Sequence, residues 1–149
     1  MSDKLISGIL EVCLFDTLLE LHFNVTVSGR KQSLSLMILD DGETIQVDQN
    51  GYWKTPENTQ YEAFSTKWVT DDRQPLGQLI DTNIEAMKCG IGKSLNGQAV
   101  AYYFHMTTNN TFLFFNNGDQ GGYLFEGIDA FLKEDIYGFT WKPVKLHNW

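Results

Sequence analysis

Several residue types are scarce in this sequence, and each scarcity excludes a class of protein. The 149 residues include only three prolines and two cysteines, and no stretch approaches the roughly 20 apolar residues of a membrane-spanning helix. Cys13 and Cys89 form no CxxC pair, so we expect two buried thiols in a reducing compartment instead of a disulfide framework. The segment MSDKLISGIL has no basic region followed by a long apolar run, which predicts a cytoplasmic protein without membrane contact.

Basic residues are also few, with 11 Lys+Arg against 19 Asp+Glu and a net charge of −8. Proteins that bind nucleic acids gain much of their affinity by neutralising phosphates with lysine and arginine. Arg30-Lys31 is the only adjacent basic pair, so we expect no nucleic-acid partner. The acidic excess suits a basic protein partner, because opposite fields steer association. Solubility alone is the simpler explanation of the same charge.

Apolar residues make up 42% of the chain, which is enough for the core of one compact domain over residues 1–149. Alternating polar and apolar residues at 33–39 predict a half-buried strand. Asp41-Gly42 and Asn50-Gly51 are strong turn signals, because such turns need positive φ angles. The same reasoning predicts extended chain over 9–15 and 18–27, as two strands or one long bent strand. It also predicts strands over 33–39, 44–48, 65–69, 79–91, 100–107, 112–115, 123–125 and 139–144, and short helices over 57–64 and 128–134.

The two halves of the chain resemble each other in their pattern of apolar residues and glycines. Five landmarks recur in the same order at offsets between 67 and 73 residues; for example, 44–47 matches 111–114 and Trp68 matches Trp141. The prediction is an α+β fold, predominantly antiparallel β. It consists of two tandem β-meander repeats, approximately 5–70 and 75–145, each with one short helix, packed around a pseudo-twofold axis. Chance similarity between two β-rich halves is the alternative.

Motifs for nucleotide or metal chemistry fail on their spacing. The segment CGIGKS at 89–94 has Met87 where a phosphate-binding loop needs its first glycine, so a strand end or bulge is the better interpretation. The glycine-rich segment 116–122 lacks the carboxylates of a calcium loop. His22, His105 and His147 match no metal-binding spacing, and structural histidines are expected. We therefore expect neither a metal nor a cofactor.

The acidic loops are the best candidates for a binding surface. The segments DDGE at 40–43 and TDDRQ at 70–74 lie in predicted turns, and Trp53 follows a turn, where an exposed tryptophan suits a binding anchor. The proposed partner-binding residues are Asp40, Asp41, Glu43, Asp48, Trp53, Asp71 and Asp72. No catalytic residue is assigned.

A small, acidic chain with these loops resembles the immunity proteins of contact-dependent inhibition and other polymorphic toxin systems. The resemblance lies in overall character and in the DDGE and TDDRQ segments. It implies a protein that binds and neutralises a cognate toxin, often a basic nuclease, by blocking its cationic cleft. The duplicated β-rich unit also resembles the Whirly architecture, which some immunity proteins share.

Two other classes of function stay open from the sequence. The first is a small-ligand-binding protein or enzyme that uses a cleft between the two repeats, with His22 or His105 beside a carboxylate. The second is a structural or phage-borne accessory protein. The oligomeric state is expected to be a monomer or a homodimer.

Overall fold

Antiparallel β-strands dominate the fold. The structure, a computed structural model, describes residues 3–50, 60–61, 64–71, 75–145 and 149, with the backbone alone at 60–61. Its strands are β1 (Lys4–Leu14), β2 (Thr17–Val27), β3 (Arg30–Ile38), β4 (Ile45–Asn50), β5 (Gln60–Tyr61), β6 (Phe64–Val69), β7 (Ala86–Lys93), β8 (Ala99–Thr107), β9 (Thr111–Asn116), β10 (Gly121–Leu124) and β11 (Thr140–Pro143). Two short helices complete the described chain, the 3₁₀ helix η1 (Pro75–Leu79) and α1 (Ile128–Leu132).

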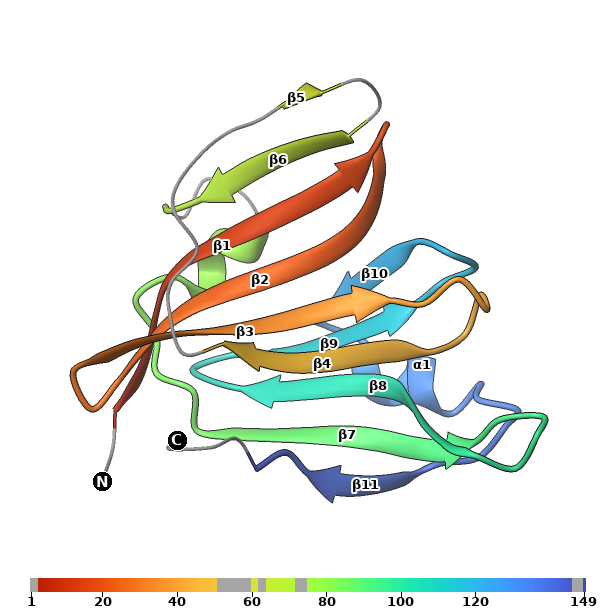
Figure 1. The fold of residues 1–149 in the computed structure, drawn as a ribbon. Coiled ribbons are helices and arrows are strands. Elements are labelled where there is room, and N and C mark those ends of the chain that lie inside the picture. Colours follow the sequence, from red (N-terminus) through yellow and green to blue (C-terminus); the bar gives the residue numbers. More distant parts are fainter. Residues whose placement is uncertain (1–2, 51–59, 62–63, 72–74, 146–148) are drawn as a thin grey trace.

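The described strands form one curled sheet (Figure 1). Its main path runs β10-β9-β8-β4-β3-β2-β1-β6-β5, and β7 and β11 extend from β8. One edge of β8 pairs with β7, while the other edge pairs with β4 at Ala101 and with β9 from Tyr103 to Thr107. The curl makes a half-barrel, and the mostly antiparallel β prediction is confirmed.

Each half of the chain has the same order of strand pairing. In the first half, β1 to β4 form a meander and β6 pairs with the free edge of β1. In the second half, β7 to β10 form a meander and β11 pairs with the free edge of β7. The two meanders lie against each other, with β10 against β2, β4 against β8 and β3 against β9.

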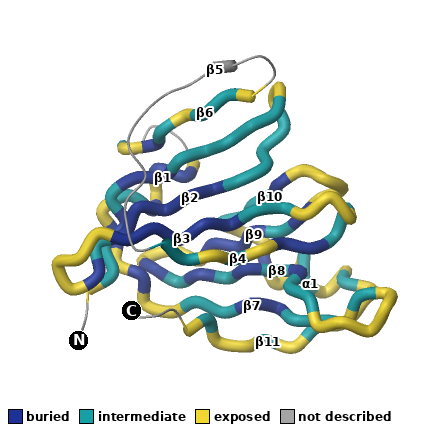
Figure 2. Tube along the Cα trace, in the orientation of Figure 1, coloured by how far each residue is buried: buried dark blue, intermediate teal, exposed yellow. Residues whose placement is uncertain are grey.

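The core lies on the inner face of this half-barrel, between the two meanders. Phe23 on β2 and Phe112 on β9 are fully buried, and their rings meet edge to face with centroids 6.0 Å apart. Leu76 and Leu79 from η1 join the same core. Figure 2 shows that burial follows β2 and β3 along most of their length, whereas the hairpin loops are exposed. Along both strands the apolar side chains join the core, and polar side chains that alternate with them, such as His22 and Ser35, are buried as well.

Two details of the predicted elements need correction. The helix expected over 57–64 is wrong where the chain is described, because Gln60–Tyr61 and Phe64 belong to strands β5 and β6. The extended segment expected over 79–91 begins too early, because Leu79 ends η1 and β7 starts at Ala86. The predicted helix at 128–134 is present in shorter form as α1.

Candidate functional site

Three loops meet at the end of the sheet where β3 finishes, and they form an acidic surface. They are the β3–β4 loop (39–44), the β9–β10 loop (117–120) and the segment between α1 and β11 (133–139), which together we call the acidic loop surface. The Gly118 amide donates to the Gly42 carbonyl at 3.2 Å, and the Asn116 side-chain amide donates to the carbonyls of Leu39 and Thr44 at 2.8 and 2.9 Å. Segments far apart in sequence are thus held together by direct hydrogen bonds.

Asp41 organises the first of these loops. Its carboxylate accepts hydrogen bonds from the backbone amides of Glu43 and Thr44 at 2.9 and 2.8 Å, and from the Thr44 hydroxyl at 2.5 Å. Partial burial opposes ionisation, but the hydrogen bonds from Thr44 and Glu43 outweigh it and lower the pKa of Asp41. Gly42 follows at φ +77°, which fits the Asp-Gly turn signal. This carboxylate is therefore ionised and fixed in place.

Glu43 connects the β3–β4 loop to the C-terminal segment. Its carboxylate accepts the Tyr137 hydroxyl at 2.6 Å, although the two residues lie 94 positions apart. The Tyr137 ring stacks on Tyr102 with centroids 5.5 Å apart and an interplanar angle of 14°. The hydrogen bond to Glu43 raises the pKa of Tyr137, because loss of the phenolic proton would place two negative charges together.

Asp135 organises the segment after α1, as Asp41 organises the β3–β4 loop. One carboxylate oxygen accepts the Tyr103 hydroxyl at 2.5 Å, and the other accepts the amides of Tyr137 and Gly138 at 3.0 and 2.6 Å. Burial and then this hydrogen bond raise the pKa of Tyr103. Asp135 thus fixes the turn that presents Tyr137.

The tyrosines and loops enclose a small pocket of about 190 Å³. Aromatic rings and loop backbone share its lining with one carboxylate, that of Glu43. The lining residues are Gly42, Glu43, Tyr102, Tyr103, Phe115, Asn116, Asn117, Gly118, Phe131 and Tyr137. Such a pocket can take a flat or extended cationic side chain, because ring faces and carboxylates both attract cations.

The structure brings together only part of the predicted acidic face. Asp40, Asp41 and Glu43 lie within the acidic loop surface. Asp48 is exposed on β4, where it accepts a hydrogen bond from Gln46 at 2.8 Å. Asp71 follows β6, whose end lies at the opposite end of the sheet from the β3–β4 loop (Figure 1). The predicted residues Trp53 and Asp72 lie outside the described residues.

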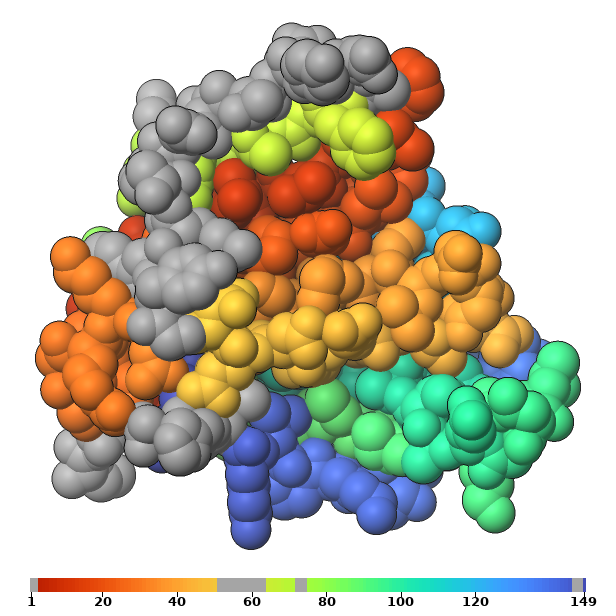
Figure 3. Space-filling model, in the orientation of Figure 1, coloured from red at the N-terminus to blue at the C-terminus, as the bar shows by residue number. Residues whose placement is uncertain are grey.

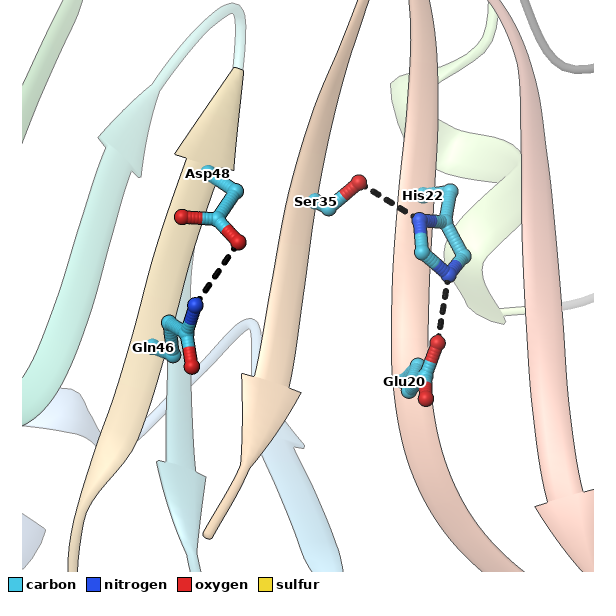
Figure 4. Close-up of polar contacts among 5 residues, drawn as sticks. All are labelled: Glu20, His22, Ser35, Gln46 and Asp48. Atoms are coloured by element: carbon cyan, nitrogen blue, oxygen red, sulfur yellow. Dashed lines mark hydrogen bonds and ion pairs between the residues drawn. The ribbon is translucent and has the colours of Figure 1, made fainter. Parts of the chain in front are cut away.

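A second polar cluster lies on the outer face of β2 to β4 (Figure 4). His22 bonds through Nδ1 to the Ser35 hydroxyl at 2.6 Å and through Nε2 to the Glu20 carboxylate at 2.8 Å. Because a carboxylate only accepts, Nε2 carries a proton and donates it to Glu20 in this hydrogen bond. Ser35 is only 2% exposed, so a substrate has no access to its hydroxyl. The cluster fits the structural histidine expected from the sequence.

The remaining motifs have structural roles. The segment CGIGKS forms most of β7, with a bulge between Gly90 and Ile91, in agreement with the strand interpretation. Cys89 is buried, which raises the pKa of its thiol to about 11, whereas Cys13 is partly exposed. Both thiols are free. Within the described residues, no group of three or more His, Cys, Asp or Glu side chains could hold a metal ion.

Comparisons with protein-family models, curated proteins and solved structures gave no match. Among the described residues, no helix has the length and apolar character needed to cross a membrane. Inferences about function therefore depend on the geometry above.

The aromatic part of the acidic loop surface escaped the sequence analysis. Tyr102 is buried, at 4% exposure, and Tyr103 is half-buried, yet both also line the pocket. Asp119 lies in the glycine-rich segment 116–122, and Tyr137 lies in a loop that no motif marks. Only the meeting of three loops brings them to a common surface. The exposed fraction of Tyr137, 54%, was not evident from sequence.

Proposed function

We propose that this chain is an immunity protein that binds a cognate toxin and neutralises it. The acidic loop surface enters the toxin's cationic cleft, and the pocket beside Tyr102 and Tyr137 receives a lysine or arginine side chain. The partner is a basic protein domain, such as a nuclease. The protein acts by binding, without catalysis, cofactor or metal, in the cytoplasm.

One observation carries the proposal. Three loops distant in sequence place Asp40, Asp41, Glu43, Asp119 and Asp135 at one end of the fold beside partly exposed tyrosine rings. The hydrogen bonds to Asp41 and Asp135 fix this geometry before any partner binds. A preorganised surface loses little conformational entropy on association, which favours affinity.

Charge and aromatic contacts contribute in different ways to such an interface. The net charge of −8 accelerates the encounter with a basic partner, an effect that added salt weakens. Tyrosine provides a large, rigid contact area at a small entropic cost and can also bond to a cation. The acidic residues therefore steer the encounter, and the tyrosine pocket anchors the complex.

We further propose that the two halves are repeats, approximately 5–70 and 75–145, related by a pseudo-twofold axis in a Whirly-like arrangement. The shared pairing order supports this, because β10 lies against β2 as β4 lies against β8. When the halves are compared by the order of strand pairing, β1 corresponds to β7 and β2 to β8. The apolar pattern of the sequence instead aligned 44–47 with 111–114, that is β4 with β9, so the two alignments differ by one strand. The proposed repeat is therefore one of strand topology more than of aligned residues.

The test is a binding assay against the protein encoded just upstream of this chain. Co-purification with that neighbour and protection of cells from its toxicity are expected. A neighbour that is not toxic, or a toxic neighbour that does not bind, contradicts the proposal. Two variants then locate the interface: Glu43→Gln, which removes a carboxylate beside Tyr137, and Tyr137→Ala, which removes the aromatic wall.

The matched control is Asp81→Asn, at the far end of the sheet. Asp81 adopts φ +62°, which asparagine tolerates, and its amide bonds to the Ile6 carbonyl near the start of β1. This variant loses one negative charge without touching the acidic loop surface. It should bind as the wild type does, whereas Glu43→Gln and Tyr137→Ala should each weaken binding about tenfold or more. Equal binding by all three variants would place the interface elsewhere.

A further inference from the structure

A groove on the outer face of the second meander lies apart from the acidic loop surface. It has a volume of about 370 Å³ and is lined by Ala86, Met87, Lys88, His105, Thr107, Trp141 and Pro143. These residues come from the start of β7, the end of β8 and the edge strand β11. A mostly apolar lining with a few polar groups, in a volume of this order, is typical of small-molecule sites.

Trp141 forms the aromatic wall of the groove, and its neighbours fix its position. Its ring meets Phe139 edge to face at a centroid distance of 5.0 Å and His105 at 5.7 Å. The Lys88 ammonium lies over the same ring, 4.5 Å from its centroid. The groove thus combines a fixed aromatic surface with a positive charge at that surface.

The charge of the groove is opposite to that of the molecule. Among the described residues of the lining, Lys88 is the only lysine, arginine or carboxylate residue, whereas the whole chain carries a net charge of −8. Within the described part of the chain, no carboxylate forms an ion pair with Lys88. A cation of this kind at an apolar wall selects an anion by charge complementarity.

The two other polar groups in the lining offer hydrogen bonds without adding charge at neutral pH. Burial, and then the nearby Lys88, lower the pKa of His105, while Asp129 on α1 opposes the shift. Neutral His105 has one N–H donor and one acceptor nitrogen. Thr107 contributes a hydroxyl on the same strand.

We propose that this groove binds a small organic anion with a flat apolar body. The anionic group, a carboxylate, lies at Lys88, and the apolar body lies against Trp141 and Met87. His105 and Thr107 orient the ligand by hydrogen bonds. This site is separate from the acidic loop surface, so it stands or fails independently of toxin binding.

The test uses naphthylacetate as the probe and naphthylethanol as its uncharged counterpart. Backbone-amide and indole NMR spectra of the full chain are recorded as each compound is added. Saturable shifts are expected at residues 86–88, 105–107 and 141, with naphthylacetate binding at least about tenfold more tightly than the alcohol. No saturable shift at these residues, or equal affinity for the two compounds, overturns the proposal.

Two lysine variants then assign the charge. Lys88→Met keeps the length of the side chain and removes the ammonium, and it should remove the preference for the acid over the alcohol. Lys142→Met is the matched control, because Lys142 is an exposed residue of β11 outside the groove lining. Loss of the preference in Lys142→Met, or its survival in a folded Lys88→Met, contradicts the assigned role of Lys88.

Discussion

Ser33 and Ser35 lie two residues apart on β3, both are buried, and they differ only in their partners. The Ser35 hydroxyl bonds to His22, whereas the Ser33 hydroxyl has no hydrogen-bond partner among the described residues. A satisfied buried hydroxyl contributes to stability, but an unsatisfied one keeps its desolvation cost. We expect Ser35→Ala to lower the free energy of unfolding by about 1 to 2 kcal/mol, and Ser33→Ala to leave it unchanged or raise it.

Urea unfolding of the two variants beside the wild type measures this difference. Each variant loses the same atom from the same face of the same strand, so each is the control for the other. Equal destabilisation by both substitutions would mean that the bond between Ser35 and His22 adds nothing. Marked destabilisation by Ser33→Ala would mean that its hydroxyl has a partner in solution.

Asp41 gives a second prediction at this scale, with a defined pH dependence. Asp41→Asn keeps the size of the side chain but loses the ionised acceptor of three hydrogen bonds, and should cost about 1 kcal/mol at neutral pH. Because folding lowers the pKa of Asp41, its stabilisation is present above the unfolded value of 3.8 and is lost as the pH falls through the folded value. The difference between wild type and variant should therefore shrink in acid.

Thermal unfolding at neutral pH and below pH 3.8 measures that change. The control is Asp40→Asn, since Asp40 is an exposed carboxylate one position away. It should alter stability little at either pH. A constant difference between wild type and Asp41→Asn across this range would contradict the assigned role of the ionised carboxylate.

At the scale of elements, β7 depends on a glycine that lies beneath an aromatic ring. A Cβ atom at Gly92 would lie 2.5 Å from the Tyr102 ring and 2.6 Å from the Gly138 carbonyl oxygen. Backbone cannot retreat easily, so Gly92→Ala should destabilise the fold by about 2 kcal/mol and displace Tyr102. Tyr102 stacks on Tyr137, so the variant should also weaken toxin binding if the proposed function is correct.

Gly8→Ala is the matched control, because Gly8 is also a strand glycine with an aromatic ring above it. Its Cβ would lie 3.4 Å from the Trp68 ring, which is an ordinary contact, so stability should change by less than about 0.5 kcal/mol. Denaturant unfolding compares the two variants. A tolerated Gly92→Ala, with the Tyr102 resonances unmoved, would show that the sheet relaxes at this point.

Sequence patterns predicted some elements well and others poorly, for physical reasons. Alternation along 33–39 predicts β3 because the leucines on one face pack into the apolar core, whereas Ser33 and Ser35 on the other face are buried outside that apolar cluster. The strand predicted over 79–91 began too early, because Leu79 belongs to a 3₁₀ helix from which Leu76 and Leu79 reach the core. Three-residue spacing in so short a segment gives no clear period, so tertiary contacts decide its conformation.

At the scale of the whole molecule, the candidate site shows the limit of sequence reasoning. The DDGE loop was identified correctly as a turn, since Asp41 and Gly42 determine it locally. The bond between Glu43 and Tyr137 joins residues 94 positions apart, and no local pattern encodes that meeting. Conversely, Asp71 was grouped with Asp40 by charge alone, and the fold places the two at opposite ends of the sheet.

The two halves share one core, which leads to a prediction about their independence. Phe23 from the first half packs against Phe112 from the second, and β4 pairs with β8 at Ala101. Figure 3 shows the surface of the first half bordering that of the second. A fragment of about 70 residues has a marginal core even when complete, and each half here would expose its inner face to water.

Fragments 1–71 and 75–149, expressed separately, should therefore lack dispersed amide spectra and cooperative thermal unfolding. The same fragments expressed together should associate and recover both properties, because the buried face of each half is the surface that the other covers. A fragment that folds alone would show that its meander is stable without its counterpart, and the core would then be two cores in contact.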